Sequence, residues 1–343
     1  MKINFSRNNG HVDSLIDQLI ETAEGIRRPG YVREMIIASL KAGQEDDESG
    51  DLKLMSTSLK EMRFTSKVFS PYRSVRKVTV FGSARTRPGD PLYRMAKLFG
   101  ERIAEAGYMV ITGGGGGIMQ AVNEGAGARH SFAVNIRLPF EERPNPVIRG
   151  NSRQIHYKYF FNRKVAFLKE SDAVALFPGG FGTLDEAMET LTLVQTGKRN
   201  PMPLLLIDDP DCSYWINLIK IFREELLSRN YISPPDFALF EQVCSVDAAV
   251  ERINRFYRRY HSSRYVNDKL VIRLTSQLGP DDIRTLTDQF AEILLPGGTI
   301  EASGALKAER DDADVIDLPR LVIDFDRRNF GRLRSLIDSI NDF

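Results

Sequence analysis

The sequence has few of the residues from which disulfide scaffolds and metal sites are built. Only two of its 343 residues are cysteines, Cys212 and Cys244, too few for a disulfide framework and not spaced as a CxxC metal site. Its four histidines are scattered along the chain without the spacing of metal ligands. It contains no G-x-S-x-G elbow and no mark of a pyridoxal phosphate lysine. We therefore expect a protein that binds no metal and no cofactor.

Long apolar runs and a strong net charge are also missing. No stretch approaches the run of about 18 apolar residues that indicates a membrane span, and the N-terminal MKINFSRNNG lacks the apolar segment of a signal peptide. The net charge of +1 favours neither nucleic acid nor an anionic membrane as a partner. With 42% hydrophobic and 27% charged residues, the sequence predicts a cytoplasmic globular protein of two or three domains.

Residues 1–75 have the apolar periodicity of helices. The acidic stretch 43–50, GQEDDESG, predicts a solvated loop between the second and third of them. The stripes are Leu15, Ile16, Leu19 and Ile20; Val32, Ile36, Ile37 and Leu40; and Leu52, Met55, Leu59 and Met62. Because no histidine, cysteine or carboxylate pair clusters here, we expect these helices to pack against the next domain or a sister subunit.

Residues 76–260 alternate short apolar runs with helical stretches. Helical patterns cover 92–106, 118–127 and 184–196, and closing helices are predicted within 213–260. The apolar runs are KVTVFGSA, GYMVITGG, HSFAVNI, DAVALFPGG and PLLLID. This order predicts an α/β fold, a Rossmann-like parallel sheet with helices on both faces. Ligands of such sheets bind beyond the carboxyl ends of the strands, where the glycine-rich loops of this chain also fall.

Residues 265–343 predict a separate small α+β domain. The polar segment HSSRYVND, 261–268, is interpreted as the linker that leads to it. The order that follows is strand, helix, strand, strand, helix, which is typical of ferredoxin-like or ACT-like domains. A second PGG within it, Pro296–Gly298, lacks the Thr and Glu that follow the first one and is interpreted as a turn.

Five consecutive glycines, Gly113–Gly117, follow one predicted strand and open a helix at Ile118 and Met119. A backbone without Cβ atoms can approach an anion closely and point several N–H groups at it. The spacing matches neither a dinucleotide G-x-G-x-x-G nor a Walker A loop. A phosphate or ribose contact is favoured over a flexible turn. The candidate ligand contacts in this segment are Gly114, Gly115, Gly116, Gly117 and Met119.

The segment Pro178–Glu186 also joins a strand to a helix. Gly179, Gly180 and Gly182 free its backbone, and a helix start adds roughly half a positive charge. The Thr183 hydroxyl is a further donor to a phosphate. An alternative is purely structural, since Thr183 and Glu186 have the spacing of a capping box in which Thr caps the helix and Glu bonds back to it.

Arg163, in the segment YFFNRK, lies in a locally basic part of the chain. Between Arg137 and Lys164 seven cationic side chains stand against Glu141 and Glu142, an excess of +5 in a nearly neutral protein. Such an excess suits an anionic ligand, although a solvated basic face is a common alternative.

Together these segments resemble the Lonely Guy (LOG) family, whose signature P-G-G-x-G-T-x-x-E is matched in full by Pro178–Glu186. Other marks of the family are FGSAR at Phe81–Arg85, TGGG-x-GIM at Thr112–Met119 and the Arg163-Lys164 pair, with Arg163 standing 15 residues ahead of Pro178. The likeness covers 76 to about 210, including LPFE and PNP within 138–146 and TLVQTGK at 192–198. The chain departs from longer relatives at Gly116 and Gln120, where Pro and Glu are frequent.

The resemblance implies a Rossmann-like fold and a phosphoribohydrolase, an enzyme that splits a nucleoside 5′-monophosphate into free base and ribose 5-phosphate. AMP and cytokinin riboside monophosphates are the substrates it implies. Arg163 and Glu186 are then the catalytic residues, the loop Gly179–Thr183 holds the phosphate, and Ser83 and Arg85 belong to the same pocket. A homodimer or higher homo-oligomer is also implied. The alternative is a protein of this fold that binds or carries a nucleotide or phosphorylated cofactor, such as molybdenum cofactor, without cleaving it.

Overall fold

The computed structural model describes residues 10–45, 48–138, 143–211, 213–309 and 312–343. The first nine residues, most of the predicted LPFE segment, both Glu141 and Glu142, and Cys212 lie outside the described residues. Residue contacts divide the chain into two units, Met1–Phe64 and Thr65–Phe343. Within the described part of the chain, no helix has the length and apolar character needed to cross a membrane.

The N-terminal region is helical, as its apolar stripes predict. Its helices are α1 (Gly10–Thr22), α2 (Pro29–Glu45) and α3 (Ser49–Phe69). The predicted loop over 43–50 is too long, because α2 continues through Gly43 and α3 already begins at Ser49. Asp51 in the first turn of α3 is favourable at a helix N-terminus, which explains why acidic residues begin a helix here instead of forming a loop.

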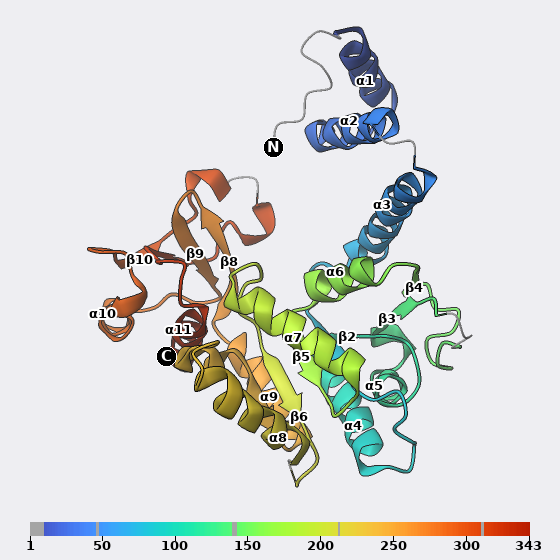
Figure 1. Cartoon of the computed structure of the whole chain (residues 1–343). Coiled ribbons are helices and arrows are strands. Elements are labelled where there is room, and N and C mark those ends of the chain that lie inside the picture. Colours follow the sequence, from blue (N-terminus) through green and yellow to red (C-terminus); the bar gives the residue numbers. More distant parts are fainter. Residues whose placement is uncertain (1–9, 46–47, 139–142, 212, 310–311) are drawn as a thin grey trace. The chain divides into compact units, whose positions relative to one another are not determined.

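The larger unit is built on a seven-stranded sheet of order β4-β3-β2-β1-β5-β6-β7, in which every neighbouring pair is parallel. Figure 1 shows its helices on both sides of the strands. The strands are β1 (Lys77–Phe81), β2 (Met109–Thr112), β3 (Ser131–Ile136), β4 (Gln154–Tyr157), β5 (Ala173–Leu176), β6 (Leu204–Ile207) and β7 (Glu241–Val243). The predicted Rossmann-like parallel sheet is confirmed. The short strands β4 and β7 lie at its two edges, and the sequence gives no apolar run for either.

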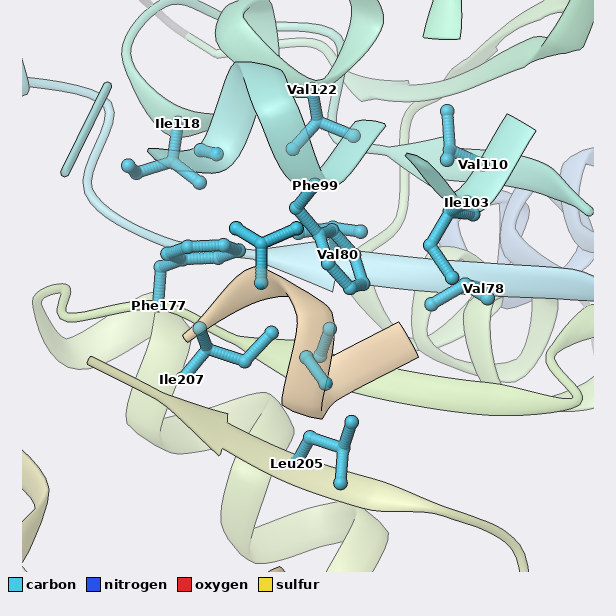
Figure 2. Packing of buried hydrophobic residues seen from close by; sticks show 14 of the residues in the cluster. Val78, Val80, Phe99, Ile103, Val110, Ile118, Val122, Phe177, Leu205 and Ile207 are labelled. Carbon is cyan, nitrogen blue, oxygen red and sulfur yellow. The ribbon is translucent and has the colours of Figure 1, made fainter. Parts of the chain in front are cut away.

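Two apolar cores cover the two faces of this sheet. On one face α4 (Pro91–Glu105), α5 (Ile118–Ala126) and α9 (Val246–Phe256) pack on the central strands. Figure 2 shows this layer, with Phe99 and Ile103 of α4 against Val78 and Val80 of β1. On the other face lie α6 (Phe160–Glu170), α7 (Phe181–Gln195) and α8 (Ser213–Ile221), which continues as a π-helical turn, Phe222–Leu227. The sheet is buried on both faces, which explains why its strands show continuous apolar runs.

A second, antiparallel sheet of order β10-β11-β9-β8 lies in the C-terminal part of the larger unit. The strands are β8 (Tyr260–Val266), β9 (Lys269–Leu274), β10 (Ile300–Ser303) and β11 (Arg320–Ile323), and the helices are α10 (Pro280–Gln289) and α11 (Phe330–Asp342). The predicted small α+β region is confirmed, with its own apolar core that includes Leu286, Phe290 and Leu336. The second PGG, Pro296–Gly298, lies outside helix and strand, between α10 and β10.

The predicted linker over 261–268 is wrong, because most of it forms the edge strand β8. A register shift between Tyr260 and Ser262 interrupts the ladder to β9. As a result the buried residues of β8 are Tyr260, Ser263 and Val266, every third residue instead of every second. A strand with this irregular spacing and polar exposed residues has no alternating pattern by which to recognise it.

Candidate active site

The site lies at the point where the strand order of the parallel sheet reverses. The chain runs from β1 outward to β4 and then returns to β5, which pairs with the other side of β1. The loops that follow β1 and β5 are joined by hydrogen bonds from Ser83 N–H to Pro178 O (3.0 Å) and from Phe177 N–H to Phe81 O (2.9 Å). The Ile118 N–H, after the five-glycine loop, donates to Ser83 O at 3.0 Å. Three loops thus meet where open α/β sheets bind their ligands.

A cavity of about 740 Å³ opens between these loops and helices α6 and α7. Its volume lies in the range of small-molecule sites. It brings together nine of the residues predicted from the sequence, from segments more than 100 residues apart. They are Ser83, Arg85, Met119, Arg163, Gly179, Gly180, Gly182, Thr183 and Glu186. The remaining lining residues are Phe81, Gly82, Ala84, Gly113, Phe167, Phe181 and Leu184.

Helix α7 begins at Phe181, three residues earlier than its apolar pattern predicts. Gly180 is the N-cap, and its carbonyl accepts hydrogen bonds from the N–H groups of Thr183 (3.0 Å) and Leu184 (3.2 Å). The alternative of a capping box formed by Thr183 and Glu186 is therefore wrong: Thr183 is the third helical residue and Glu186 lies in the second turn. The glycine-rich turn after β5 needs no side-chain cap, and both side chains line the cavity instead.

The start of α7 provides donors for an anion. Among the described residues, the N–H groups of Phe181 and Gly182 have no acceptor, as is usual in the first turn of a helix. These donors and the positive end of the helix dipole suit a phosphate or carboxylate group. The Phe181 side chain is 93% exposed, so it stands at the rim of the cavity without filling it.

Close packing explains why Gly179 is glycine. A Cβ atom there would lie 2.2 Å from Thr183 Oγ1 and 3.0 Å from Ser83 N. The Gly179 carbonyl accepts a hydrogen bond of 2.6 Å from the hydroxyl of Tyr214 on α8. The loop is therefore held from both sides, by the turn after β1 and by α8.

The five-glycine loop is mostly a packed structural turn. Gly114 and Gly117 have positive φ values of 72° and 62°, and a Cβ on Gly117 would lie 2.2 Å from Ser83 O. Asn145 supports the loop through hydrogen bonds from its N–H to Gly114 O (2.9 Å) and from its Nδ2 to Gly115 O (3.1 Å). Packing and backbone conformation therefore explain much of this loop without a ligand.

A second cavity, of about 200 Å³, adjoins the first and shares Gly113, Met119 and Arg163 with it. Gly115 lines this smaller cavity. Gly114, Gly116 and Gly117 line neither of the two, so the structure does not bring them to a ligand position. Positive φ and close backbone packing account for the conformations of Gly114 and Gly117 without a ligand.

Glu186 lines the main cavity, is 2% exposed and has one unsatisfied oxygen. Among the described residues, its Oε2 has no hydrogen-bond partner, and its Oε1 lies 3.9 Å from Lys164 Nζ. Burial raises the pKa of the Glu186 carboxyl to about 7, and the positive charges of Lys164 and then Arg163 oppose that rise. A carboxyl with this pKa can hold or release a proton near neutral pH, as acid–base catalysis requires.

Arg163 lines both cavities from the first turns of α6. Its guanidinium carbon lies 4.8 Å from the ring centroid of Phe160, and its Nε has no partner among the described residues. Burial lowers the pKa of Arg163, and the nearby Glu186 opposes this shift. No ion pair within 4.0 Å joins these two described side chains. Arg163 and Glu186 each keep an unsatisfied buried atom beside the cavity.

Lys164, the next residue along α6, contacts the carboxylates of α7. Its Nζ lies 2.8 Å from Asp185 Oδ2 and 2.6 Å from Glu189 Oε2, in addition to the longer contact with Glu186. No pattern in the sequence predicts this cluster, because it depends on how α6 and α7 cross. The family spacing of the Arg163-Lys164 pair is the signal that could have indicated it.

The basic residues of 137–164 separate into two groups. Arg143 and Arg163 line the smaller cavity. Arg153 instead donates to Tyr72 Oη (2.8 Å) and Ala128 O (2.7 Å), and Lys164 is occupied by carboxylates. The excess positive charge is therefore partly structural, and a minority of these cations reach a possible ligand.

The sheet order and the switch-point cavity define a Rossmann-like α/β protein whose site holds a buried Glu186 and a partly buried Arg163. The family described as "Possible lysine decarboxylase" matches residues 116–253. The "Probable cytokinin riboside 5'-monophosphate phosphoribohydrolase LOG4" of Oryza sativa subsp. japonica is 31% identical over 153 residues, 43% of this chain and 64% of that protein. The "Cytokinin riboside 5'-monophosphate phosphoribohydrolase LOG" of the same plant is 33% identical over 150 residues, 40% of this chain and 60% of that protein. The predicted resemblance to the LOG family is confirmed.

The chain spans less than two thirds of the length of these curated relatives. Among solved structures, the molybdenum cofactor carrier protein of Chlamydomonas reinhardtii is 19% identical, with a TM-score of 0.37 over 53% of this chain and 97% of that one. A molybdenum cofactor binding protein of Rippkaea orientalis is 21% identical, with a TM-score of 0.36 over 52% of this chain and 94% of that one.

Proposed function

We propose that this protein hydrolyses the N-glycosidic bond of nucleoside 5′-monophosphates of the AMP or cytokinin riboside monophosphate type. The oxygen of a water molecule bonds to C1′ of the ribose and the bond from C1′ to the base nitrogen breaks. The base takes that electron pair and the proton that the water loses, so the products are free base and ribose 5-phosphate. One observation carries the proposal: Arg163 Nε and Glu186 Oε2 are buried, lack partners among the described residues, and belong to side chains that line one cavity. Buried polar atoms are normally satisfied, so these two are candidates for contact with a substrate.

The lining residues divide naturally between the parts of such a substrate. The free N–H groups of Phe181 and Gly182, the Thr183 hydroxyl and the dipole of α7 suit the 5′-phosphate. Gly113 and Met119, on the opposite wall, suit the ribose. Ser83 and Arg85, after β1, complete the wall beside the phosphate position. Each of these assignments is part of the proposal.

Glu186 has the charge that glycosidic cleavage requires. The transition state resembles an oxocarbenium ion, with positive charge at C1′. An ionised Glu186 would stabilise that charge and orient the attacking water. Arg163 would anchor the nucleotide or the departing base, and its charge helps to keep Glu186 ionised. Because Glu186 acts as a carboxylate in this scheme, activity should rise as pH passes through about 7.

The decisive experiment incubates the full chain with a panel of nucleoside monophosphates and measures free base and ribose 5-phosphate. We expect release of adenine from AMP, and a fall of roughly two orders of magnitude in the Glu186→Gln variant. Glu124→Gln is a matched control, because it makes the same change at a half-buried glutamate that accepts hydrogen bonds from Tyr93 and Gln120 and does not line the cavity.

Two results would contradict the proposal. Undiminished turnover in Glu186→Gln would remove Glu186 from the reaction. Tight binding of AMP without any product would instead indicate a protein that binds or carries a nucleotide or phosphorylated cofactor.

We also propose that the protein forms a homodimer or higher homo-oligomer. Exposed apolar side chains on the N-terminal helices support this, among them Leu15, Leu19, Met55 and Leu59. Light scattering after size-exclusion chromatography gives the mass in solution, and a mass of one 38.8 kDa chain at micromolar concentration would contradict the proposal.

A further inference from the structure

Lys164 is placed to act on the site without touching a ligand. It does not line the main cavity, and its side chain is 19% exposed. Its ammonium group contacts three carboxylates on α7: Glu189 at 2.6 Å, Asp185 at 2.8 Å and Glu186 at 3.9 Å. Lys164 follows Arg163 on α6, so the contact joins the helix that carries one proposed catalytic residue to the helix that carries the other.

We propose that Lys164 is a positioning residue for Glu186: it offsets part of the negative charge of the carboxylate cluster on α7 and ties that helix to α6. The effect of Lys164 on catalysis rests on the proposed function. Its effect on the ionisation of Glu186 does not. A lysine ammonium has three donors, which fits two short contacts and one longer one.

The cluster needs a cation. Asp185, Glu186 and Glu189 lie within one turn of α7, and carboxylates this close repel each other. Asp185 and Glu189 are partly exposed, at 58% and 30%, but Glu186 is buried and its charge is poorly hydrated. The other positive charge that opposes the rise in its pKa is Arg163, from α6. Arg85 lines the same cavity from the loop after β1.

Removing the positive charge of Lys164 and removing the negative charge of Glu189 should shift the pKa of Glu186 in opposite directions. Lys164→Met removes the cation that most strongly opposes protonation of Glu186 and leaves three unbalanced carboxylates, so the pKa of Glu186 should rise above about 7. Glu189→Gln removes a repelling carboxylate and frees Lys164 to approach Glu186, so the pKa should fall. Lys164→Arg keeps the charge and should preserve the wild-type value. A merely structural role for Lys164 would not give shifts of opposite sign.

Infrared titration of the ligand-free protein measures this directly. The protonated carboxyl band of Glu186 is identified by its loss in Glu186→Gln and followed against pH. We expect its midpoint to move up by about one pH unit or more in Lys164→Met, down in Glu189→Gln, and little in Lys164→Arg. Lys169→Met is the matched control, since Lys169 lies on the same helix but pairs with Glu170. Circular dichroism at each pH establishes that each variant is folded.

The pH dependence of kcat/KM for adenine release from AMP gives the second readout. Its acidic limb should move in the same directions as the infrared midpoints. Unmoved midpoints in Lys164→Met, or midpoints that move the same way in Lys164→Met and Glu189→Gln, would overturn the inference while leaving the hydrolase intact. Shifted midpoints in a protein that cleaves no nucleotide would support the role of Lys164 and contradict the proposed function.

Discussion

A grouping of arginine and glutamate in the antiparallel region and another at the switch point of the parallel sheet differ in how well their polar atoms are satisfied. In the antiparallel region, Glu309 is fully buried and accepts from Arg273 Nε (2.9 Å), Arg273 Nη2 (2.6 Å) and Arg320 Nε (3.3 Å). It also accepts from the Leu306 N–H at 3.2 Å. At the switch point, Glu186 Oε2 accepts nothing among the described residues.

The pKa values of the two carboxyls shift in opposite directions. Desolvation raises the pKa of both. For Glu309, the hydrogen bonds from Arg273 and Leu306 and the charges of Arg273 and Arg320 outweigh it, so the pKa is lowered. For Glu186 desolvation prevails and the pKa rises to about 7. The carboxyl whose oxygens are satisfied therefore has a lowered pKa, and the carboxyl with an unsatisfied oxygen has a raised one.

The largest effect that tests this contrast is expected from Glu309→Gln. The change leaves the buried Arg273 and Arg320 short of a counter-charge, and breaking a buried ion pair costs about 3–5 kcal/mol. Urea unfolding of the variant should show this loss of free energy of unfolding. Adenine release per folded molecule should stay at the wild-type level, because Glu309 does not line the main cavity. A change below about 1 kcal/mol in the free energy of unfolding would mean that the ion pairs of Glu309 do not stabilise the fold.

Glu186→Gln should raise the free energy of unfolding at neutral pH, by less than Glu309→Gln lowers it. The folded-state pKa of Glu186, about 7, is above its ordinary 4.5, so the folded protein binds more protons than the unfolded chain between these values. Stability from this group is therefore complete below about pH 4.5 and is lost as pH rises to about 7, up to about 3 kcal/mol.

Urea unfolding of wild type and Glu186→Gln at several pH values checks the sign. The free energy of unfolding of the variant should increase relative to that of the wild type as pH rises. The difference between the two should become constant above pH 7 to 8. Glu124→Gln is the control, because the pKa of Glu124 is lowered and its removal should bring no gain at high pH. A difference that stays constant across the range would mean that Glu186 is not a buried, unsatisfied carboxyl.

Much of the frame of the site can be predicted from the sequence. The apolar runs that form β1, β2 and β5 end in glycine-rich loops, and parallel strands bring such loops to one edge. The resemblance to the LOG family, of which the spacing of Arg163 from the PGG segment is one mark, implies that both belong to one pocket. The loops therefore come together as expected, and so do the two side chains proposed for catalysis.

What could not be predicted depends on contacts between elements. Thr183 and Glu186 have the spacing of a capping box, but the turn after β5 starts the helix at Phe181 and leaves both side chains for the cavity. The five glycines suggest an anion loop, whereas Gly117 is required by the nearby carbonyl of Ser83. Lys164 meets the carboxylates of α7 because the two helices cross at that position, which a linear pattern does not encode.

The smallest expected effect, on KM, comes from the hydrogen bond between Tyr214 and the loop after β5. Tyr214 Oη donates to Gly179 O at 2.6 Å, and Gly179 lines the main cavity just ahead of Phe181 and Gly182, whose N–H groups are the proposed phosphate donors. Tyr214→Phe removes a hydrogen bond that contributes about 0.5–1.5 kcal/mol. We expect KM for AMP to rise by up to about tenfold while kcat stays near wild type, since Glu186 and Arg163 are untouched. Tyr93→Phe, which removes a 2.9 Å hydrogen bond to Glu124 outside the cavity, should leave both constants unchanged. If kcat fell and KM did not rise, the loop would act on the chemical step. The loop would then share in catalysis with Arg163 and Glu186, and its role would not be limited to holding the phosphate.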